Sequence, residues 1–482
     1  KKKENALIFE TFSADTDTPV SLFLKYFEGK DDSFLLESVT GGEIKGRYSI
    51  IGTKPDLIWK CEGDKAFISR NCSDFVEDSR GAIDSLRNIL EESSMKFPES
   101  LPPMSSGLFG YLGYEMIGLV EKIPQSNVDR LNVPDSIFIR PSVITIVDGV
   151  KDEVTIVCPV WYNSFNGYEE ALMESKFLLN EVIETLSKPL SIAKKPKKSK
   201  EAPKILKSNT TKSEYLNLVE NAKESIKSGE IFQIVLSQRW ERDFLLPHIS
   251  LYRALRRTNP SPYMFFFKFK DFSIVGASPE ILVKVVDNEV TIRPIAGTRP
   301  RGKNIEEDQA LASDLLNDEK ENAEHLMLLD LGRNDVGKVS KIGSVRPTET
   351  FIIEKYSHVM HIVSNVVGKL KESEDCISAL FAGLPAGTVS GAPKIRAMEL
   401  IDKLEKEKRG VYGGGVGFFS SDGSMDICIA LRTGIIKNQK LFIQAGGGVV
   451  YDSDPEKEYE ETINKSKALV VAAQEAFKYN HN

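Results

Sequence analysis

Two pairs of glutamates with the spacing Glu-x-x-Glu are the residues best placed to do chemistry: Glu321 with Glu324, and Glu458 with Glu461. Residues three apart lie on the same face of a helix. Leu328 continues the first stripe, which indicates that these acids face inward. Converging carboxylates in a half-buried site need a compensating charge, and a hard, oxygen-seeking cation such as Mg²⁺ supplies one. On spacing alone, two salt-bridged surface helices remain an alternative.

The composition is typical of a globular enzyme with a large core. The chain has 482 residues, of which 41% are hydrophobic and 28% are charged. Its net charge of −7 argues against a nucleic-acid partner. It contains no run of about 18 apolar residues and does not begin with an apolar signal segment, so we expect no membrane association. The five cysteines are scattered without metal-ligand spacing and predict reduced thiols in a cytoplasmic protein.

Composition also divides the chain into three parts. An N-terminal region covers 1–186, a linker rich in Lys and Pro covers 187–207, and a third region covers 208–482. Strand-like runs dominate the first region, with helices predicted at 81–92 and 168–186.

The third region alternates predicted strands with long helices. Helices are expected at 212–228, at 306–335 and from Pro455 onward, where Asp454 is the predicted N-cap. Mostly antiparallel strands combined with long helices indicate the α+β fold class.

Three glycine-rich segments, at 387–394, 413–417 and 446–448, invite comparison with nucleotide-binding loops. The first lacks the spacing of a phosphate-binding loop, and the second precedes a predicted strand instead of a helix, so neither fits a nucleotide. Glycines 446–448 follow a predicted strand and allow backbone amides to approach a small anionic ligand. The helix expected near Pro393 directs its positive end at the preceding loop. Tight turns without any ligand are the alternative.

Four motifs in order along the chain carry a family resemblance. They read RPIAGTRPRG at 293–302, DEKENAEHLMLLDLGRND at 318–335, LPAGTVSGAPK at 384–394 and QAGGG at 444–448. The series resembles the chorismate-utilising enzymes, and within them the large subunits of anthranilate synthases, over roughly residues 230–470. The resemblance implies two large, mostly antiparallel sheets packed face to face with flanking helices.

The resemblance also implies a role for each glutamate of the two pairs. Glu324 and Glu461 correspond to direct Mg²⁺ ligands, and Glu321 and Glu458 to partners that act through water. Glu280, in the segment GASPE at 276–280, corresponds to the general acid that protonates a departing hydroxyl.

Further residues match the catalytic and substrate-binding positions of the family. Thr298 would bind near the leaving hydroxyl, Lys465 lies beside the metal end, and His361 corresponds to a residue implicated in the later loss of pyruvate. A buried core histidine and a plain salt bridge are the alternatives for His361 and Arg432. The implied substrate site consists of Gly297, Thr298, Thr388, Tyr412, Arg432, Gly446, Gly447 and Gly448.

Two positions separate the branches of the family. Gln233 stands where isochorismate and salicylate synthases carry a Lys that activates water, and Ala296 where aminodeoxychorismate synthases carry a Lys that attacks carbon 2. Direct addition of ammonia is therefore expected, which makes the chain a carbon–oxygen lyase that produces anthranilate. An aminodeoxychorismate or aminodeoxyisochorismate synthase, and a tryptophan-sensing scaffold without activity, are the alternatives. Because no amidotransferase motif is visible, ammonia is expected from a separate glutaminase subunit.

The N-terminal region resembles the part of the family that binds tryptophan as a feedback inhibitor. The matching segments are LLES at 35–38 and NPSPYMF at 259–265. A core strand and a Pro-rich turn are the alternative. The implied feedback residues are Glu37, Ser38, Arg47, Asn259, Pro262, Tyr263 and Met264.

Overall fold

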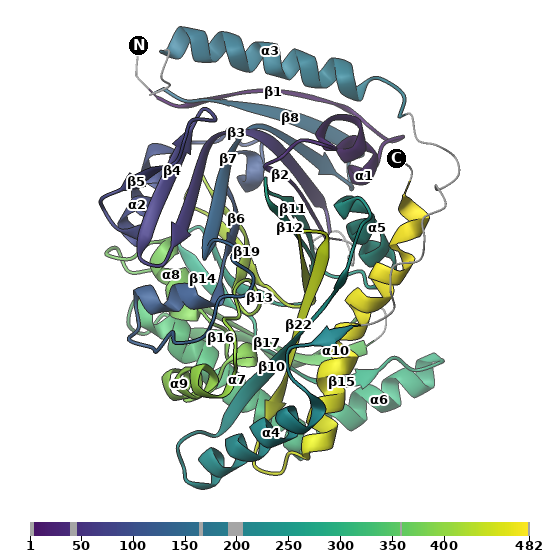
Figure 1. The fold of residues 1–482 in the computed structure, drawn as a ribbon. Helices are drawn as coiled ribbons and strands as arrows, with labels where there is room; N and C mark the ends of the chain where they lie inside the picture. The colour runs from purple at the N-terminus through teal and green to yellow at the C-terminus, as the bar shows by residue number, and fades with distance from the viewer. Residues whose placement is uncertain (1–3, 39–45, 163–166, 191–205, 357–358, 481–482) are drawn as a thin grey trace.

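The protein is built from long antiparallel strand ladders with helices packed around them (Figure 1). The computed structural model describes residues 4–38, 46–162, 167–190, 206–356 and 359–480. Hydrogen bonds join the described strands into one continuous network of 22 strands. The predicted α+β class with mostly antiparallel strands is therefore confirmed.

The strands follow the chain from one end to the other. They are β1 (Ala6–Ser13), β2 (Ser33–Glu37), β3 (Tyr48–Glu62), β4 (Lys65–Arg70), β5 (Val76–Asp78), β6 (Gly107–Leu112), β7 (Ser136–Asp148), β8 (Glu153–Val160), β9 (Lys207–Ser208), β10 (Gln233–Asp243), β11 (Tyr263–Lys268), β12 (Phe272–Ser278), β13 (Ile281–Val286), β14 (Glu289–Ile292), β15 (Ile295–Pro300), β16 (Arg346–Lys355), β17 (Val359–Lys369), β18 (Gly391–Ala392), β19 (Gly415–Ser420), β20 (Met425–Ile429), β21 (Thr433–Lys437) and β22 (Lys440–Val449).

The helices lie outside the strand network. The α-helices are α1 (Pro19–Leu22), α2 (Ala82–Glu92), α3 (Tyr168–Leu186), α4 (Lys212–Lys227), α5 (His248–Thr258), α6 (Ile305–Asn317), α7 (Glu319–Val339), α8 (Cys376–Gly383), α9 (Lys394–Leu404) and α10 (Pro455–Glu475). Short 3₁₀ or π turns are η1 (Phe23–Phe27), η2 (Pro103–Ser105), η3 (Tyr114–Leu119), η4 (Gly387–Val389) and η5 (Ala476–Tyr479).

Three apolar clusters show how the layers are arranged. The buried members of one cluster come from strands and loops, among them Phe34, Phe109, Ile144, Phe267 and Ile435. Since no helix residue enters its buried set, this core lies between facing strand layers. The other two clusters include residues of α2, α8 and α9, or of α3, α5 and α10. Two strand layers face to face with helices outside, as predicted, account for all three clusters.

Two capping aspartates fix the helices that carry the glutamate pairs. The Asp318 carboxylate accepts hydrogen bonds from the backbone N–H groups of Lys320 and Glu321, which starts α7. Asp454 caps α10, with Pro455 as its first residue. The single helical block predicted at 306–335 is wrong in one respect. The extended backbone of Asp318 breaks it into α6 and α7.

Strands from the N-terminal region pair with strands of the third region. β2 pairs with β11, and β6 pairs with β19. The two regions therefore share one hydrogen-bonded network, and the division at 1–186 and 208–482 stays a prediction. Most of the predicted linker at 187–207 lies outside the described residues.

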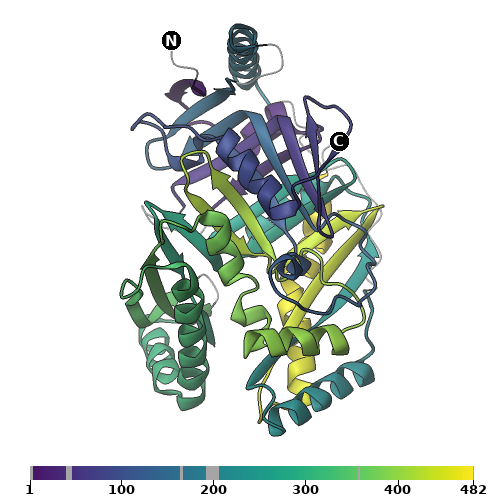
Figure 2. The same cartoon turned by 90° about the vertical axis from the view of Figure 1, so that its left-hand side faces the viewer.

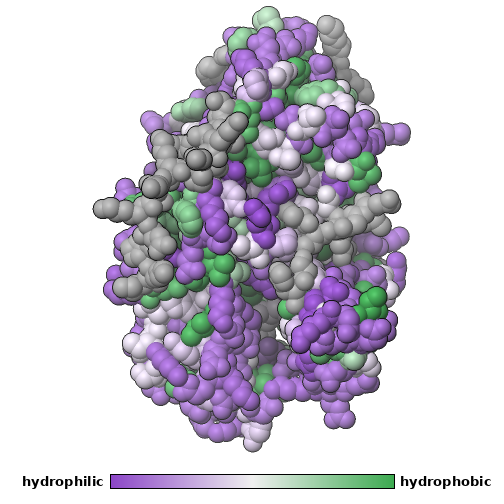
Figure 3. Space-filling model, turned by 90° about the vertical axis from the view of Figure 1, so that its right-hand side faces the viewer, coloured by the Kyte–Doolittle hydropathy of each residue, from purple (hydrophilic) through white to green (hydrophobic). Residues whose placement is uncertain are grey.

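The lower half of the molecule has two parts (Figure 2). One contains β14 to β17 with α6 and α7, and the other contains β10, β22, α4, α9 and α10. The opposite view shows a mainly hydrophilic face with a hollow between the two parts (Figure 3). Lys320 on α7 bridges them through an ion pair of 3.2 Å with Asp452, in the turn before α10. None of the described helices is long and apolar enough to cross a membrane.

Candidate active site

The two glutamate pairs meet between α7 and α10. Burial, together with the nearby carboxylates of Glu321, Glu458 and Glu461, raises the pKa of Glu324 to about 7. Burial also raises the pKa of Glu321 and of Glu458. Because the carboxylates of Glu321, Glu458 and Glu461 all act on Glu324, the structure brings together the groups that the spacing singled out.

Positive charges offset only part of this negative charge. Glu461 lies 2.6 Å from the ammonium of Lys465, and Glu321 lies 3.4 Å from the guanidinium of Arg299. Glu458 Oε2 is buried without a hydrogen-bond partner among the described residues. Within the described ranges, no three His, Cys, Asp or Glu side chains lie close enough to hold a metal ion directly. An orphaned buried oxygen beside carboxylates of raised pKa still fits a cation that keeps water between itself and some ligands.

Glu280 is a buried carboxyl group at the turn between β12 and β13, with 6% of its surface exposed. Burial raises its pKa to about 8, against the opposing hydrogen bond from Thr388. The Thr388 hydroxyl lies 3.2 and 3.3 Å from the two carboxyl oxygens. At neutral pH this carboxyl is therefore mainly protonated, as a general acid must be.

His361 on β17 faces the strand that carries Gly297 and Thr298. Its Nδ1 lies 2.9 Å from the carbonyl oxygen of Gly297 and 3.1 Å from the hydroxyl of Thr298. Burial lowers its pKa, and Arg432 lowers it further, so the ring is neutral at neutral pH. Since a carbonyl can only accept, Nδ1 carries the hydrogen and Nε2 is free to accept a proton.

Glycines 446–448 on β22 allow three side chains to approach the backbone closely. A Cβ at position 446 would lie 2.8 Å from the Tyr412 hydroxyl. At 447 it would lie 3.2 Å from the Glu458 carboxylate, and at 448 it would lie 3.0 Å from the Gln233 amide nitrogen. The three glycines therefore lie against Tyr412 of the predicted substrate site, Glu458 of the predicted metal site and Gln233, which is predicted to face the nucleophile. A larger residue would push these side chains away from the strand.

Gly297 on β15 likewise allows a side chain, that of Glu321, to approach the backbone closely. Its φ of +67° is in the left-handed region, and a Cβ there would lie 3.1 Å from Glu321 Oε2. Lys465 links the glycine strand β22 to the glutamates of α10. Its ammonium donates to the carbonyl of Gly446 at 3.1 Å and also pairs with Glu461.

Part of the predicted feedback site also comes together. Glu37 and Met264 are register partners where β2 pairs with β11. The buried Glu37 carboxylate accepts hydrogen bonds from Arg256 Nε and Nη2 at 2.9 and 3.0 Å. Ser38 follows Glu37 and is half-buried, and α5 ends at its C-cap Asn259.

The other predicted feedback residues have partners elsewhere. Pro262 precedes Tyr263, whose hydroxyl donates to Asp426 at 3.1 Å. Arg47 forms a two-pronged ion pair with Asp148 at the start of β3. Their membership of one binding site stays a prediction.

Sequence reasoning missed several residues that shape these sites. The ring of Tyr356 lies 5.6 Å from that of His361, and its hydroxyl donates to Glu354. Arg256 neutralises Glu37, and Arg299 bridges Glu321 and Asp318. Arg299 directly follows Thr298 in the motif at 293–302, so the sequence contained a signal for it. Tyr356 and Arg256 lie in no motif.

Comparison with known proteins shows the family to which the chain belongs. The model of the family described as chorismate binding enzyme matches residues 32–471, and the chain therefore belongs to that family. The chain is 56% identical to anthranilate synthase component 1 of Cereibacter sphaeroides, over 99% of this chain and 96% of that protein. It is 47% identical to component 1 of Pseudomonas putida, over 95% of this chain and 93% of that protein. The crystal structure of anthranilate synthase component I from Streptococcus pneumoniae is 40% identical and superposes with a TM-score of 0.78, covering 90% of this chain and 94% of that one.

The state of Glu280 can be measured directly. In infrared difference spectra against Glu280→Gln, we expect the carbonyl band of a protonated carboxyl group at neutral pH, lost as pH rises through about 8. Thr388→Val should move the midpoint to higher pH, because the hydroxyl stabilises the ionised form. Ser390→Ala is the matched control, since that hydroxyl donates to Ala386 and not to Glu280. An ionised carboxylate at pH 6 would contradict the assignment.

Proposed function

We propose that the chain is the large, chorismate-binding subunit of an anthranilate synthase, which converts chorismate and ammonia into anthranilate, pyruvate and water. The observation that carries this proposal is Glu280, a carboxyl group held protonated by burial and hydrogen-bonded to Thr388. The relatives named anthranilate synthase component 1 support it over nearly the whole chain.

In the first step, the nitrogen lone pair forms a bond to carbon 2 of chorismate and the ring diene shifts. The bond from carbon 4 to its hydroxyl breaks, and that hydroxyl takes the proton of Glu280 and leaves as water. The added nitrogen then gives up one proton, which balances the proton lost by Glu280. A hydroxyl is a poor leaving group unless it is protonated, so the raised pKa of Glu280 serves this step. Thr298 lies beside His361 and would bind near this hydroxyl.

In the second step, carbon 2 loses its proton and the bond from carbon 3 to the ether oxygen breaks. The enolpyruvyl group leaves with the electrons of that bond and takes up a proton to become pyruvate, and the ring becomes aromatic. We assign the proton transfer to His361, whose Nδ1 is held by the Gly297 carbonyl so that Nε2 can accept. Arg432 and Tyr412, with the amides of 446–448, would bind the enolpyruvyl carboxylate.

Two residues favour ammonia as the nucleophile. Gln233 presents a buried Oε1 without a hydrogen-bond partner among the described residues, which can accept a hydrogen bond from ammonia. Ala296 on β15 has no nucleophilic group, which disfavours an aminodeoxychorismate synthase. The component 1 names of the relatives imply a second component, and a glutaminase subunit would supply the ammonia.

Magnesium is the cofactor that this site would hold. Glu324 and Glu461 would be direct ligands, with Glu321 and Glu458 acting through water; the unpartnered Glu458 Oε2 and the raised pKa of Glu324 support this. When bound, Mg²⁺ would anchor and polarise the ring carboxylate as a Lewis acid. Lys465 would hold Glu461 in place from the adjoining turn of α10.

Tryptophan would bind as a feedback inhibitor beside β2 and β11. Glu37 and Arg256 offer one buried ion pair for its amino and carboxylate groups, and Met264 lies opposite Glu37 in register. Tyr263, Pro262 and Asn259 would line the same site from the end of α5, with Arg47 beyond Ser38.

The proposed reaction has a direct test. The isolated chain should make anthranilate from chorismate, Mg²⁺ and ammonium salts at alkaline pH, measured by product fluorescence and mass. It should not use glutamine alone, since no nucleophilic residue for glutamine hydrolysis is assigned. Aminodeoxychorismate as the product, or glutamine-dependent turnover by the pure chain, would sink the proposal.

Glu324→Gln tests the metal assignment. We expect weaker Mg²⁺ binding by calorimetry and loss of turnover, because an amide oxygen is a weaker ligand than a carboxylate. In chelator the unfolding temperature should be unchanged or higher, since the variant removes a like charge from the cluster. Glu319→Gln, on the exposed side of the same helix, should behave like wild type. Wild-type turnover of Glu324→Gln at millimolar Mg²⁺ would rule out a ligand role.

Ser38→Arg tests the feedback site. Ser38 is half-buried next to Glu37, so an arginine there would fill the space of a ligand. Tryptophan inhibition should weaken by at least about tenfold, which corresponds to 1.4 kcal/mol of binding free energy, while uninhibited turnover persists. Identical inhibition curves for the variant and wild type would refute the location of the site.

A further inference from the structure

Arg409, in the loop between α9 and β19, is among the most deeply buried charged residues of the structure, with 1% of its surface exposed. Its guanidinium binds both oxygens of Glu405, at 2.9 and 2.5 Å. The remaining N–H groups donate to the carbonyl oxygens of Val389 and Val235, at 2.6 and 2.7 Å. A buried charge satisfied in this way fixes the geometry of everything that it contacts.

The partners of Arg409 belong to separate parts of the proposed chorismate site. Val389 follows Thr388, the residue that hydrogen-bonds the general acid. Val235 lies two residues from Gln233 on β10. The guanidinium also lies 5.6 Å from the ring centroid of Tyr412, whose hydroxyl lies against Gly446.

The N-terminal region closes this cluster from the other side. Glu115, in η3, accepts hydrogen bonds from the backbone N–H groups of Arg409 and Gly410, at 2.7 and 2.9 Å. The ring of Tyr114 lies over the guanidinium at 4.7 Å, and its backbone N–H donates to the carbonyl of Gly410 at 2.8 Å. One short N-terminal segment thus holds both the backbone and the side chain of Arg409.

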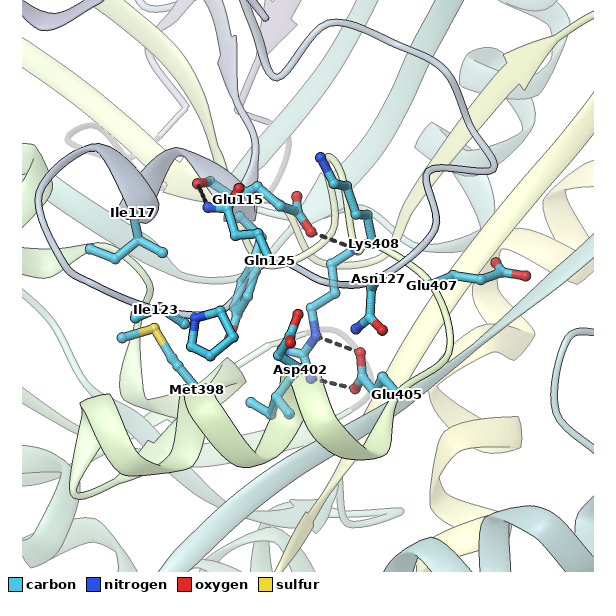
Figure 4. A pocket seen from close by; sticks show the side chains of 14 residues that line it. Glu115, Ile117, Ile123, Gln125, Asn127, Met398, Asp402, Glu405, Glu407 and Lys408 are labelled. Carbon is cyan, nitrogen blue, oxygen red and sulfur yellow. Dashed lines mark hydrogen bonds and ion pairs between the residues drawn. The ribbon is translucent and has the colours of Figure 1, made fainter. Parts of the chain in front are cut away.

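Figure 4 shows this arrangement around a small hollow that Glu115, Glu405 and Arg409 help to line. Glu115 reaches the loop that contains Lys408, and Glu405 on the opposite side holds the guanidinium. Asp402 on α9 makes a second link across the hollow, accepting hydrogen bonds from the backbone and hydroxyl of Ser126. That second link ties the N-terminal region to α9 and does not touch Arg409.

We propose that Arg409 is a positioning residue of the chorismate site and that Glu115 sets it, so that the N-terminal region forms part of the catalytic framework. The inference rests on the proposed function for the identity of the substrate. Tyr412 and Thr388 are the residues through which Arg409 acts on bound chorismate and on the general acid.

Glu115→Gln is the principal test. It keeps the shape of the side chain but replaces one of the two carboxylate oxygens that accept hydrogen bonds from the backbone of Arg409 and Gly410. We expect the KM for chorismate to rise about fivefold or more with kcat within about twofold, and the calorimetric Kd for chorismate with Mg²⁺ to rise in parallel. Asp402→Asn, the matched control, weakens the other link across the hollow and should leave both constants within about twofold of wild type.

Arg409→Lys is a second variant that keeps the charge but loses the planar fork. Here kcat should also fall, and the pH midpoint of the Glu280 infrared band should rise, since Arg409 would no longer hold the carbonyl of Val389, which follows Thr388. If this variant fails to fold, Glu115→Gln still decides the matter.

Unchanged KM and Kd in Glu115→Gln would overturn the inference, and so would equal shifts in Glu115→Gln and Asp402→Asn. Equal shifts would mean that the region contributes only general stability. The chorismate Kd separates this result from a failure of the proposed function. The wild-type chain could bind chorismate without making anthranilate, while the Kd for chorismate still rises in Glu115→Gln and not in Asp402→Asn. That result would refute the proposed reaction and support the positioning role.

Discussion

The burial of carboxyl groups away from water is the constraint on which the candidate sites of this molecule depend. An ionised carboxylate is costly to bury unless it is paired, bonded or protonated. Glu405 and Glu37 are paired with Arg409 and Arg256. Glu280 avoids the cost by keeping its proton, since burial outweighs the Thr388 hydroxyl, the Ile295 backbone and the more distant Lys465, which all favour the ionised form. The cluster around Glu324 is only partly neutralised, which leaves it ready for a cation.

These different solutions correspond to different tasks. A carboxylate fully paired with arginine has a fixed charge and a fixed place, so it can organise backbone but cannot exchange a proton. A buried carboxyl without a cationic partner can donate a proton, because its two protonation states are close in free energy near neutral pH. The same residue type therefore serves as a strut in Glu405 and as a proposed acid in Glu280, and only the neighbours differ.

Much of the fold and of the site could be predicted from the sequence where local patterns carry the information. The capped helices that bear the glutamate pairs follow from Asp454 and Pro455 and from helical spacing. The break at Asp318 was missed, although Asp is a common N-cap residue and no apolar side chain lies between Leu316 and Ala323. Arg409 belongs to none of the motifs, although its ion-pair partner Glu405 is only four residues away. Its partner Glu115 lies 294 residues away, and neither residue belongs to a repeating pattern.

The shared strand network explains how residues as far apart in the chain as Glu115 and Arg409 are placed within hydrogen-bonding distance. β6 pairs with β19 immediately beside the segment that holds Arg409, so η3 is delivered to that loop by backbone hydrogen bonds. Gly113, between β6 and η3, accommodates the close approach, since a Cβ there would lie 2.9 Å from the carbonyl oxygen of Gly410. Strand register sets side-chain positions to within a fraction of a residue, and a slip of one residue would turn every side chain to the other face. The N-terminal strands consequently position the loop that holds Arg409, which belongs to the proposed chorismate site, and contribute no proposed reacting group. A division of this chain by composition therefore does not coincide with a division of its proposed chemistry.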